Sequence, residues 1–399
     1  MKKSLRSVLV LVLLACATAV SGQTRLEMKA HELWVMTGDS ITAQRLHSNY
    51  IEAFYRARYP DLHLQFRNSG IGGNTTGSVL ARFDYDVAAW KPTIVSVELG
   101  MNDVGAGEDP SRYLEGMKNL LARIRAVGAT PVLISSSPVN DGSKLDAWKG
   151  DRCRKIHPYT VALGTLAQAE KVAFVDQYHP LLDLWAGNKL PDGKERFPLS
   201  GDAVHPGPAG QLTMAAAILT ALGADPEVSS ATLNAAGAVV EKKLCEISNV
   251  AAKDGGLSFT RLDQRGPWPI APPCREALKL MPQIADLSRY MLKVTGLADG
   301  QYAVSMNGKP VAQLTAKELA AGWNMSTLAE GAIAERSAKI VELVTQLQGP
   351  LNTAWRAASK AKESDKLAEC QKTIDTCEAQ LAAACKPVAI QVEIRPAGK

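Results

Sequence analysis

The stretch that decides the fold is Leu33-Trp34-Val35-Met36-Thr37-Gly38-Asp39-Ser40. Its first four residues are apolar and predict a strand, and Gly38-Asp39-Ser40 follows directly. Ser40 therefore lies where a strand gives way to a helix, with its hydroxyl group at the carboxyl edge of a sheet. Its amide lies near a helix amino terminus, which favours a nucleophile. Asp and Ser are also ordinary helix caps, so the tripeptide alone does not establish a chemistry.

Strand-like apolar runs alternate with helical patterns from Glu32 to about Gly223. The other runs are residues 63–67, 93–98, 131–135 and 172–176, and the stretches between them, such as 41–59 and 110–127, carry apolar residues three and four apart. This alternation predicts an α/β unit with a parallel sheet covered by helices. In such open sheets ligands bind beyond the carboxyl ends of the strands. We therefore expect functional residues directly after these runs.

The pattern changes after Asp225. Strand-like pieces at 239–247, 257–262, 292–297 and 301–306 precede the hairpin signal Asn307-Gly308 and a short helix with a capping box, Thr315 and Glu318. Residues 329–386 have a helical period with a break at Gly349-Pro350, which predicts two helices, and a last strand alternates over 388–394. The sequence thus predicts a signal peptide at 1–22, a catalytic domain at 23–225, and a mixed α+β accessory region with a helical hairpin at 226–399.

The amino terminus has the layout of a secretory signal. Lys2, Lys3 and Arg6 precede an apolar run that is too short to span a bilayer, and small residues follow. We expect export to the periplasm or the exterior, with no transmembrane segment in the mature chain. In an alternative, Leu13-Leu14-Ala15-Cys16 acts as a lipobox and Cys16 carries a lipid, although Leu14 matches a lipobox poorly. Six further cysteines predict disulfides of open pairing: Cys153, Cys245, Cys274, Cys370, Cys377 and Cys385.

Composition excludes two classes of protein. Of 399 residues, 46% are hydrophobic and 21% are charged, which is incompatible with a chain that is disordered throughout. The 45 basic and 40 acidic residues give a net charge of +5 with no long basic run, which argues against a nucleic-acid partner.

Three more polar blocks follow the strands. Asn68-Ser69-Gly70-Ile71-Gly72-Gly73-Asn74-Thr75 follows the second strand, and its glycines let backbone amides turn toward an anion; it lacks the Lys of a phosphate loop. Gly100-Met101-Asn102-Asp103 follows the third strand and offers a neutral amide donor. Asp202-Ala203-Val204-His205-Pro206 combines a carboxylate and an imidazole just before a helix that ends near Leu222.

These four blocks resemble those of the SGNH hydrolases, the GDSL-type serine esterases, across about residues 32–223. The resemblance implies a flavodoxin-like three-layer sandwich that needs no cofactor and no metal. It implies a triad of nucleophile, base and orienting carboxylate, namely Ser40, His205 and Asp202. It also implies an oxyanion hole made by the amides of Ser40 and Gly73 and the side chain of Asn102. Gly70 and Gly72 make the second block richer in glycine than usual, which leaves the identity of its amide donor open.

Two alternatives compete for parts of this site. Asp176-Gln177-Tyr178-His179-Pro180 repeats the Asp-x-x-His-Pro spacing after a strand, but we favour the later pair because Pro206, Pro208 and Gly210 open the last helix of the unit. Asp39, Asp103 and Asp202 as an acidic cluster for a metal or for glycoside hydrolysis would leave Ser40, Asn102 and His205 without a role. The remaining histidines, His31, His47, His63 and His157, are expected on the surface or in the core.

Two tryptophans receive different interpretations. Trp34 lies on the apolar first strand and is expected in the core. Trp148 lies in a polar stretch, residues 139–157, that reads as a long loop and is a candidate wall of the substrate pocket.

The sequence therefore predicts an exported serine hydrolase that cleaves carboxylic esters through an acyl-Ser40 intermediate. Analogy with exported members of the family favours a carbohydrate O-acetylesterase, with a small-molecule or polysaccharide ester as substrate. The alternatives are a lipid or aryl esterase, an acyltransferase on the same site, and a non-catalytic envelope or glycan-binding protein. The oligomeric state is not indicated.

Overall fold

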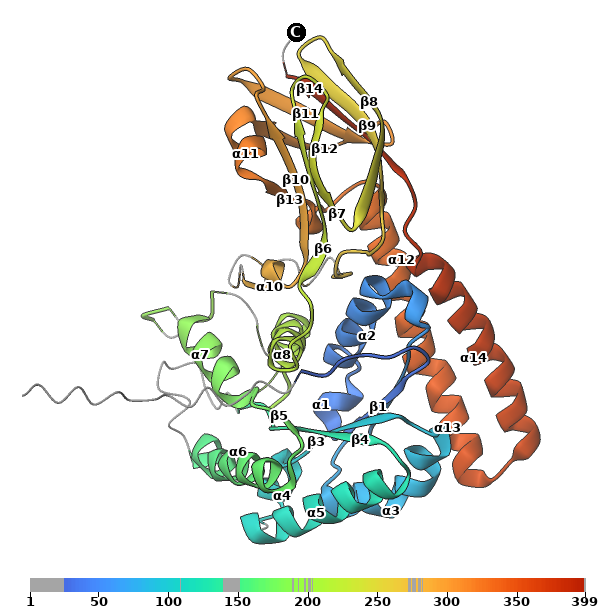
Figure 1. The fold of residues 1–399 in the computed structure, drawn as a ribbon. Helices are drawn as coiled ribbons and strands as arrows, with labels where there is room; N and C mark the ends of the chain where they lie inside the picture. The colour runs from blue at the N-terminus through green and yellow to red at the C-terminus, as the bar shows by residue number, and fades with distance from the viewer. Residues whose placement is uncertain are drawn as a thin grey trace, which may run out of the picture.

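The structure, a computed structural model, consists of an α/β unit, a β-sandwich above it and long helices along one side (Figure 1). It describes residues 25–107, 109–138, 151–188, 190–192, 194–196, 199, 202, 204–271, 274, 278, 281 and 283–397. The predicted signal peptide and Trp148 lie outside these residues.

Five parallel strands form the central sheet in the order β2-β1-β3-β4-β5. They are β1 (Leu33–Gly38), β2 (Gln65–Gly70), β3 (Ile94–Glu98), β4 (Thr130–Ile134) and β5 (Ala173–Val175), close to the five predicted runs. Both faces of such a sheet are covered, which explains why the strands are nearly continuous apolar runs. The strand order is that of a flavodoxin-like fold, so the predicted fold class is confirmed.

Helices cover the sheet on both faces (Figure 1). α2 (His47–Arg58) and α8 (Pro208–Ala221) pack on one face together with α7 (Tyr178–Asn188). The other face is covered by α3 (Thr76–Asp86), α5 (Pro110–Ala126) and α6 (Asp151–Glu170). Shorter helical turns complete this unit: α1 (Ser40–Ala43), η1 (Pro60–Leu62), η2 (Ala88–Trp90) and α4 (Met101–Gly105).

Two local predictions in this unit need correction. The single helix expected over 41–59 is divided into α1 and α2, because Arg45 adopts φ 60 and interrupts the helix. The loop expected over 139–157 is helical from Asp151, where α6 begins. Trp34 is fully buried, as predicted, and its indole Nε1 donates to Ser96 Oγ at 3.0 Å.

The second half contains a β-sandwich. One sheet has the order β13-β10-β6-β7 and the other the order β12-β11-β14-β9-β8, with an apolar core between them. The strands are β6 (Glu227–Asn234), β7 (Val239–Lys243), β8 (Cys245–Lys253), β9 (Gly256–Asp263), β10 (Arg289–Thr295), β11 (Gln301–Met306), β12 (Lys309–Thr315), β13 (Trp323–Asn324) and β14 (Ile390–Pro396). Between them lie α10 (Gln283–Asp286), α11 (Ala316–Ala321) and η5 (Met325–Thr327).

The turn signals of this region are confirmed, but one strand prediction is wrong. Asn307 and Gly308, at φ 48 and 77, form the hairpin between β11 and β12, and Thr315 with Glu318 forms the capping box of α11. The run 239–247, predicted as one strand, contains β7 and the start of β8, which belong to different sheets. Leu244, at φ 56, makes the corner between them.

The carboxyl-terminal helices form the predicted hairpin with its turn at another place. They are α12 (Ala332–Gln346), a π-helical turn η6 (Leu347–Leu351), α13 (Asn352–Ala361) and α14 (Ser364–Cys385). Gly349-Pro350 was expected to separate two helices, but the wider π turn carries the helix past Pro350, which has no N–H to donate. The chain reverses at Lys362, which adopts φ 57.

These helices close the free edge of β2. Gln348 Nε2 donates to the carbonyl of Phe66 at 2.7 Å, and Gln348 Oε1 accepts from the amide of Asn68 at 3.0 Å. Arg356 donates to the carbonyl of Asn68 at 2.8 Å. An edge strand otherwise presents unpaired backbone groups. The side chains of the helices thus replace a sixth strand.

The apolar cores cross the predicted boundary between residues 225 and 226. Trp355 of α13 stacks on Trp90 with ring centroids 3.4 Å apart, and Leu381 of α14 belongs to the same buried cluster as Val35 of β1. On the other face, Trp268 packs edge-on against Phe54 of α2. The division into two domains stays a prediction from the sequence.

The expected disulfides are not found among the described cysteines. The thiols of Cys245, Cys274, Cys370, Cys377 and Cys385 are all free. Three of them lie along α14, where the rise of the helix separates them beyond the reach of a disulfide bond.

We expect Gln348→Ala to lower the free energy of unfolding by about 2 to 4 kcal/mol, because the buried amide of Asn68 and carbonyl of Phe66 lose their partner. Urea unfolding of the full chain measures this loss. The matched control is Gln346→Ala, whose side chain is exposed two residues away and whose change should cost little. Equal stability of the two variants would contradict the role of Gln348 at the sheet edge.

Candidate active site

Ser40 is positioned by the turn that follows β1. Asp39 caps α1 by accepting a hydrogen bond from the amide of Ile41 at 2.9 Å. A Cβ at position 38 would lie 2.7 Å from the carbonyl oxygen of Glu98, so only glycine lets β1 and β3 end this close together. The Ser40 hydroxyl therefore stands at the carboxyl edge of the sheet, where the sequence placed it.

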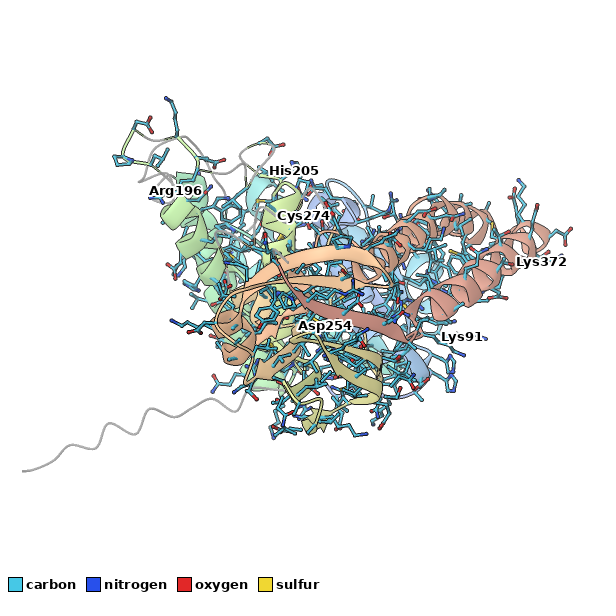
Figure 2. The ribbon with its side chains drawn as sticks, turned by 90° about the horizontal axis from the view of Figure 1, so that it is seen from above. Lys91, Arg196, His205, Asp254, Cys274 and Lys372 are labelled. Carbon is cyan, nitrogen blue, oxygen red and sulfur yellow. The ribbon has the colours of Figure 1, made fainter. Side chains whose placement is uncertain are left out.

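The structure brings Ser40, His205 and Asp202 into one hydrogen-bonded chain. His205 Nε2 lies 2.8 Å from Ser40 Oγ, and His205 Nδ1 lies 2.8 Å from Asp202 Oδ2. Figure 2 shows His205 on the side of the molecule opposite Lys91, which precedes β3 at the amino edge of the sheet. The three side chains are thus brought together from residues 162 and more positions apart, at the carboxyl edge.

The carboxylate of Asp202 is fixed by its own loop. Its Oδ1 accepts hydrogen bonds from the amides of His205 at 2.8 Å and Val204 at 2.7 Å. These backbone bonds, together with the bond to the His205 ring, lower the pKa of Asp202 to about 2. An ionised Asp202 keeps the proton of His205 on Nδ1, so that Nε2 is free to accept the proton of Ser40.

The loop after β2 lies opposite the nucleophile. Gly73 adopts φ 75, a conformation that glycine tolerates, and a Cβ at Gly72 would lie 3.9 Å from Cβ of Ser40. Gly72 is therefore the glycine whose α-carbon faces Ser40. The sequence predicted the Gly73 amide as a donor, and both amides belong to the same turn.

Asn102, in α4 after β3, is held with one donor to spare. Its Nδ2 donates to the carbonyl of Asn74 at 3.0 Å, which uses one of the two N–H groups of the amide. Arg82 in turn donates to Oδ1 of Asn74 at 2.8 Å and, through its other nitrogens, contacts β1 and Asp86. This chain of contacts fixes the amide of Asn102 beside the glycine loop.

A buried carboxyl group joins the strand ends behind the nucleophile. Glu98, the last residue of β3, accepts from Thr42 Oγ1 at 2.9 Å and from Gln177 Nε2 at 2.7 Å. Burial raises the pKa of Glu98 to about 7, and burial together with the nearby Glu98 raises the pKa of Asp39 to about 7. Three loops, after β1, β3 and β5, therefore meet at one carboxyl group.

His47 extends this network to the His205 loop. Its Nδ1 lies 2.6 Å from Gln211 Oε1, which also accepts from the amide of His47, so Nδ1 carries the proton. Burial lowers the pKa of His47 to about 4, and its Nε2 faces Glu98 Oε2 at 3.5 Å. Gln211 Nε2 donates to Gln44 Oε1 at 2.6 Å, and Gln44 Nε2 donates to the carbonyl of Pro206 at 3.3 Å. The helix after Ser40 is thereby tied to the residue that follows His205.

Sequence reasoning missed these supporting residues. Glu98 was visible as an acid at the end of the apolar run Ile94–Glu98, a position where a charged residue needs a partner. His47 was expected only as a surface or core residue, and Gln211 and Gln177 carry no motif. Their contacts arise from the tertiary fold.

The competing assignments fall into other places. His179 does not contact Ser40; it pairs with Asp176 at 2.6 Å and faces His157. Asp103 is fully buried and caps α3 by accepting from the amide and hydroxyl groups of Thr76, each at 3.0 Å. Asp39 likewise serves as a helix cap, so the three aspartates of the proposed acidic cluster do not gather as one site in the described structure.

Three wider features frame the site. A cavity of about 1010 Å³ between α7 and α8, with Asp176 on its wall, is lined by none of Ser40, Asp202 and His205. Among the described residues, no three His, Cys, Asp or Glu side chains gather as a set of metal ligands. Within the same part of the chain, every helix is too short or too polar to cross a membrane.

Comparison with known proteins identifies relatives of the first half. The profile of the GDSL-like lipase/acylhydrolase family matches residues 36–212. An acetylxylan esterase of Geobacillus stearothermophilus is 26% identical over 186 residues, which span 44% of this chain and 79% of the relative. The esterase TesA of Pseudomonas aeruginosa is 28% identical over 155 residues, which span 37% of this chain and 72% of the relative. An arylesterase of Vibrio mimicus is 30% identical over 141 residues, 34% of this chain and 66% of the relative.

A solved structure has the same fold along most of the chain. The structure of a gut microbial diltiazem-metabolizing enzyme superposes with a TM-score of 0.80 at 21% identity and covers 94% of this chain and 100% of its own. The combination of α/β unit, sandwich and long helices therefore recurs in another protein.

The raised pKa of Glu98 predicts a pH dependence of stability. The folded protein holds the Glu98 proton up to about pH 7, whereas the unfolded chain releases it near its model value of 4.5, so stability should fall as the pH rises across this interval. Glu98→Gln keeps the neutral form at every pH. We expect its free energy of unfolding to fall less than that of the wild type between about pH 5 and about pH 8.

Urea unfolding at the two pH values measures this difference. Glu335→Gln is the control, since Glu335 is 62% exposed and pairs with Lys309 on the surface. An unchanged pH dependence in Glu98→Gln would show that the Glu98 carboxyl group is ionised in the folded protein.

Proposed function

The chain belongs through residues 36–212 to the GDSL-like lipase/acylhydrolase (SGNH) family of carboxylic ester hydrolases, and on that basis we propose that it deacetylates carbohydrates through an acyl-Ser40 intermediate. The observation that carries the mechanism is the 2.8 Å contact of Ser40 Oγ with His205 Nε2, backed by Asp202. A serine hydroxyl is a weak nucleophile until such a base removes its proton.

The acylation half-reaction follows from this contact. Ser40 Oγ attacks the ester carbonyl carbon while its proton passes to His205 Nε2, and Asp202 stabilises the resulting imidazolium ion. The carbonyl oxygen becomes an oxyanion, which we assign to the amides of Ser40 and Gly73 and the free N–H of Asn102. The intermediate then expels the alcohol, which leaves with the proton from His205 and the acyl group on Ser40.

Deacylation repeats the same steps with water. His205 Nε2 removes a proton from a water molecule, the hydroxide attacks the acyl carbon, and the new oxyanion occupies the same donors. Collapse returns the proton to Ser40 Oγ and releases the carboxylic acid. Donors of this kind each contribute about 3 to 4 kcal/mol to lowering the barrier.

Two observations support a carbohydrate ester as substrate. The site is open, since the side chains of His205 and Asp202 are 35% and 59% exposed, and an open edge admits a substituent on a long chain. The acetylxylan esterase among the relatives acts on such a polymer by its name. The TesA and arylesterase relatives keep lipid and aryl esters, and acyl transfer, as alternative outcomes of the test.

We expect a fluorophosphonate to label the wild type at Ser40 and not to label Ser40→Ala. His205→Ala should lower kcat for an aryl acetate by about 10⁴-fold or more, because Ser40 loses its base. The matched control is His179→Ala, which removes the other Asp-x-x-His histidine and should leave labelling and kcat near wild type. Equal loss of activity in both histidine variants would contradict the assignment of His205.

The substrate is tested separately with the full-length protein. Acetate release from acetylated xylan should exceed acyl release from pectin, aryl acetates and lysophospholipids, with Ser40→Ala as the blank. Normal labelling of Ser40 without release from any acetylated polysaccharide would refute the substrate class and leave the ester hydrolase intact.

We further propose that the protein is exported, on the charged, apolar and small-residue layout of its first 22 residues. Expression in a bacterium followed by mass spectrometry of the cell fractions tests this. Export predicts a chain outside the cytoplasm that lacks about the first 22 residues. An uncleaved chain confined to the cytoplasm would contradict it.

A further inference from the structure

Asp176 and His179 have the spacing of the catalytic pair but face another partner. His179 Nδ1 lies 2.6 Å from Asp176 Oδ2 at the start of α7. Its Nε2 lies 3.3 Å from Nε2 of His157, which belongs to α6. The two imidazoles thus point nitrogen to nitrogen between two helices, at the same edge of the sheet as Ser40, and the ester hydrolase mechanism uses neither of them.

The separation of the two nitrogens equals that of two ligands on one zinc ion. With Zn–N bonds of about 2.0–2.1 Å and a tetrahedral angle, two ligand nitrogens lie about 3.3–3.4 Å apart. The ring centroids of His157 and His179 are 5.3 Å apart, and the ring planes meet at 88°. The centroids are farther apart than the nitrogens, so the rings diverge from a common point, as they do when both lone pairs meet at a metal.

Asp176 prepares His179 for this role. It accepts the proton on Nδ1, which leaves the lone pair of a neutral ring on Nε2. A carboxylate in this position orients a histidine ligand and increases its basicity. The His157 and His179 side chains are exposed, His179 to 48%, so an ion reaches them from solvent.

The other close histidine pair of the protein lacks this geometry. His31 and His63 stack face to face, with ring centroids 5.6 Å apart and planes 8° apart. Parallel stacked rings direct their lone pairs side by side and do not converge on one ion. This pair therefore provides an internal control with the same residue types.

We propose that His157 and His179 bind a divalent transition-metal ion of the zinc class, with Asp176 as the carboxylate behind His179. Two imidazoles supply the protein ligands, and water completes the tetrahedron. The proton that His157 or His179 shares across the 3.3 Å contact moves to solvent or to the other ring nitrogen when the metal takes its place. The ion joins α6 to α7 next to the carboxyl edge of the sheet.

The test is isothermal titration of chelator-treated full-length protein with Zn²⁺. We expect one ion to bind per wild-type chain and the site to be lost in His157→Ala, in His179→Ala and in the double variant. Asp176→Asn should weaken binding by about 10- to 100-fold, since the ring keeps its place but loses the carboxylate. His63→Ala, the control from the stacked pair, should bind as the wild type does.

A second readout separates binding from misfolding. Zn²⁺ should raise the Tm of the wild type and of His63→Ala and leave that of the double variant unchanged, because a ligand that binds only the folded state stabilises it. Hydrolysis of an aryl acetate by each variant reports that the fold is intact. Zinc binding that persists in the double variant, or no saturable binding by the wild type up to about 1 mM, would overturn the proposal.

Discussion

Burial of the Glu98 carboxyl group is the constraint on which the carboxyl edge of the sheet depends. A carboxyl group removed from water must be neutral or fully hydrogen-bonded, and here Thr42 and Gln177 donate to it while the neutral ring of His47 faces it. Each of these side chains comes from a different loop. Satisfying one buried group therefore fixes the loops after β1 and β5 relative to the end of β3.

The same constraint reaches the base. His47 is held by Gln211, and Gln211 is linked through Gln44 to the carbonyl of Pro206, next to His205. The contact between Ser40 and His205 is therefore one link of a closed ring of hydrogen bonds. Buried polar networks of this kind rigidify a structure when every member is satisfied. The site has a defined geometry although two of its three triad residues are partly open to solvent.

The sequence predicted the parts of the fold that depend on local pattern. All five strands of the parallel sheet, the position of Ser40 and the hairpin at Asn307-Gly308 follow from apolar periodicity and turn chemistry. The errors occurred where tertiary packing overrides local preference. Pro350 usually ends a helix, but a π turn accommodates it; Leu244 and Arg45 turn the chain with positive φ, which no residue preference indicates.

The site could be predicted in its chemistry and not in its support. Ser40, Asn102 and the Asp202–His205 pair stand in recognisable blocks, and the choice between His205 and His179 rested on the helix start that follows. Gln348 closing the edge of β2, and Gln177 reaching Glu98, join residues far apart in sequence through ordinary amides. Only the folded chain identifies them. The cysteine count misled, because five of the six cysteines serve as small apolar side chains.

The contact of the carboxyl-terminal helices with β2 imposes an order of events on biosynthesis. A ribosome that has completed residue 225 has supplied every group of the triad and the oxyanion loop, but not Gln348, Trp355 or Leu381. Until these arrive, one border of the nascent sheet stays open and Trp90 lacks its stacking partner. The enzyme therefore matures only when translation is nearly finished, and a chain still in transit retains the loose state that passage through a translocon requires.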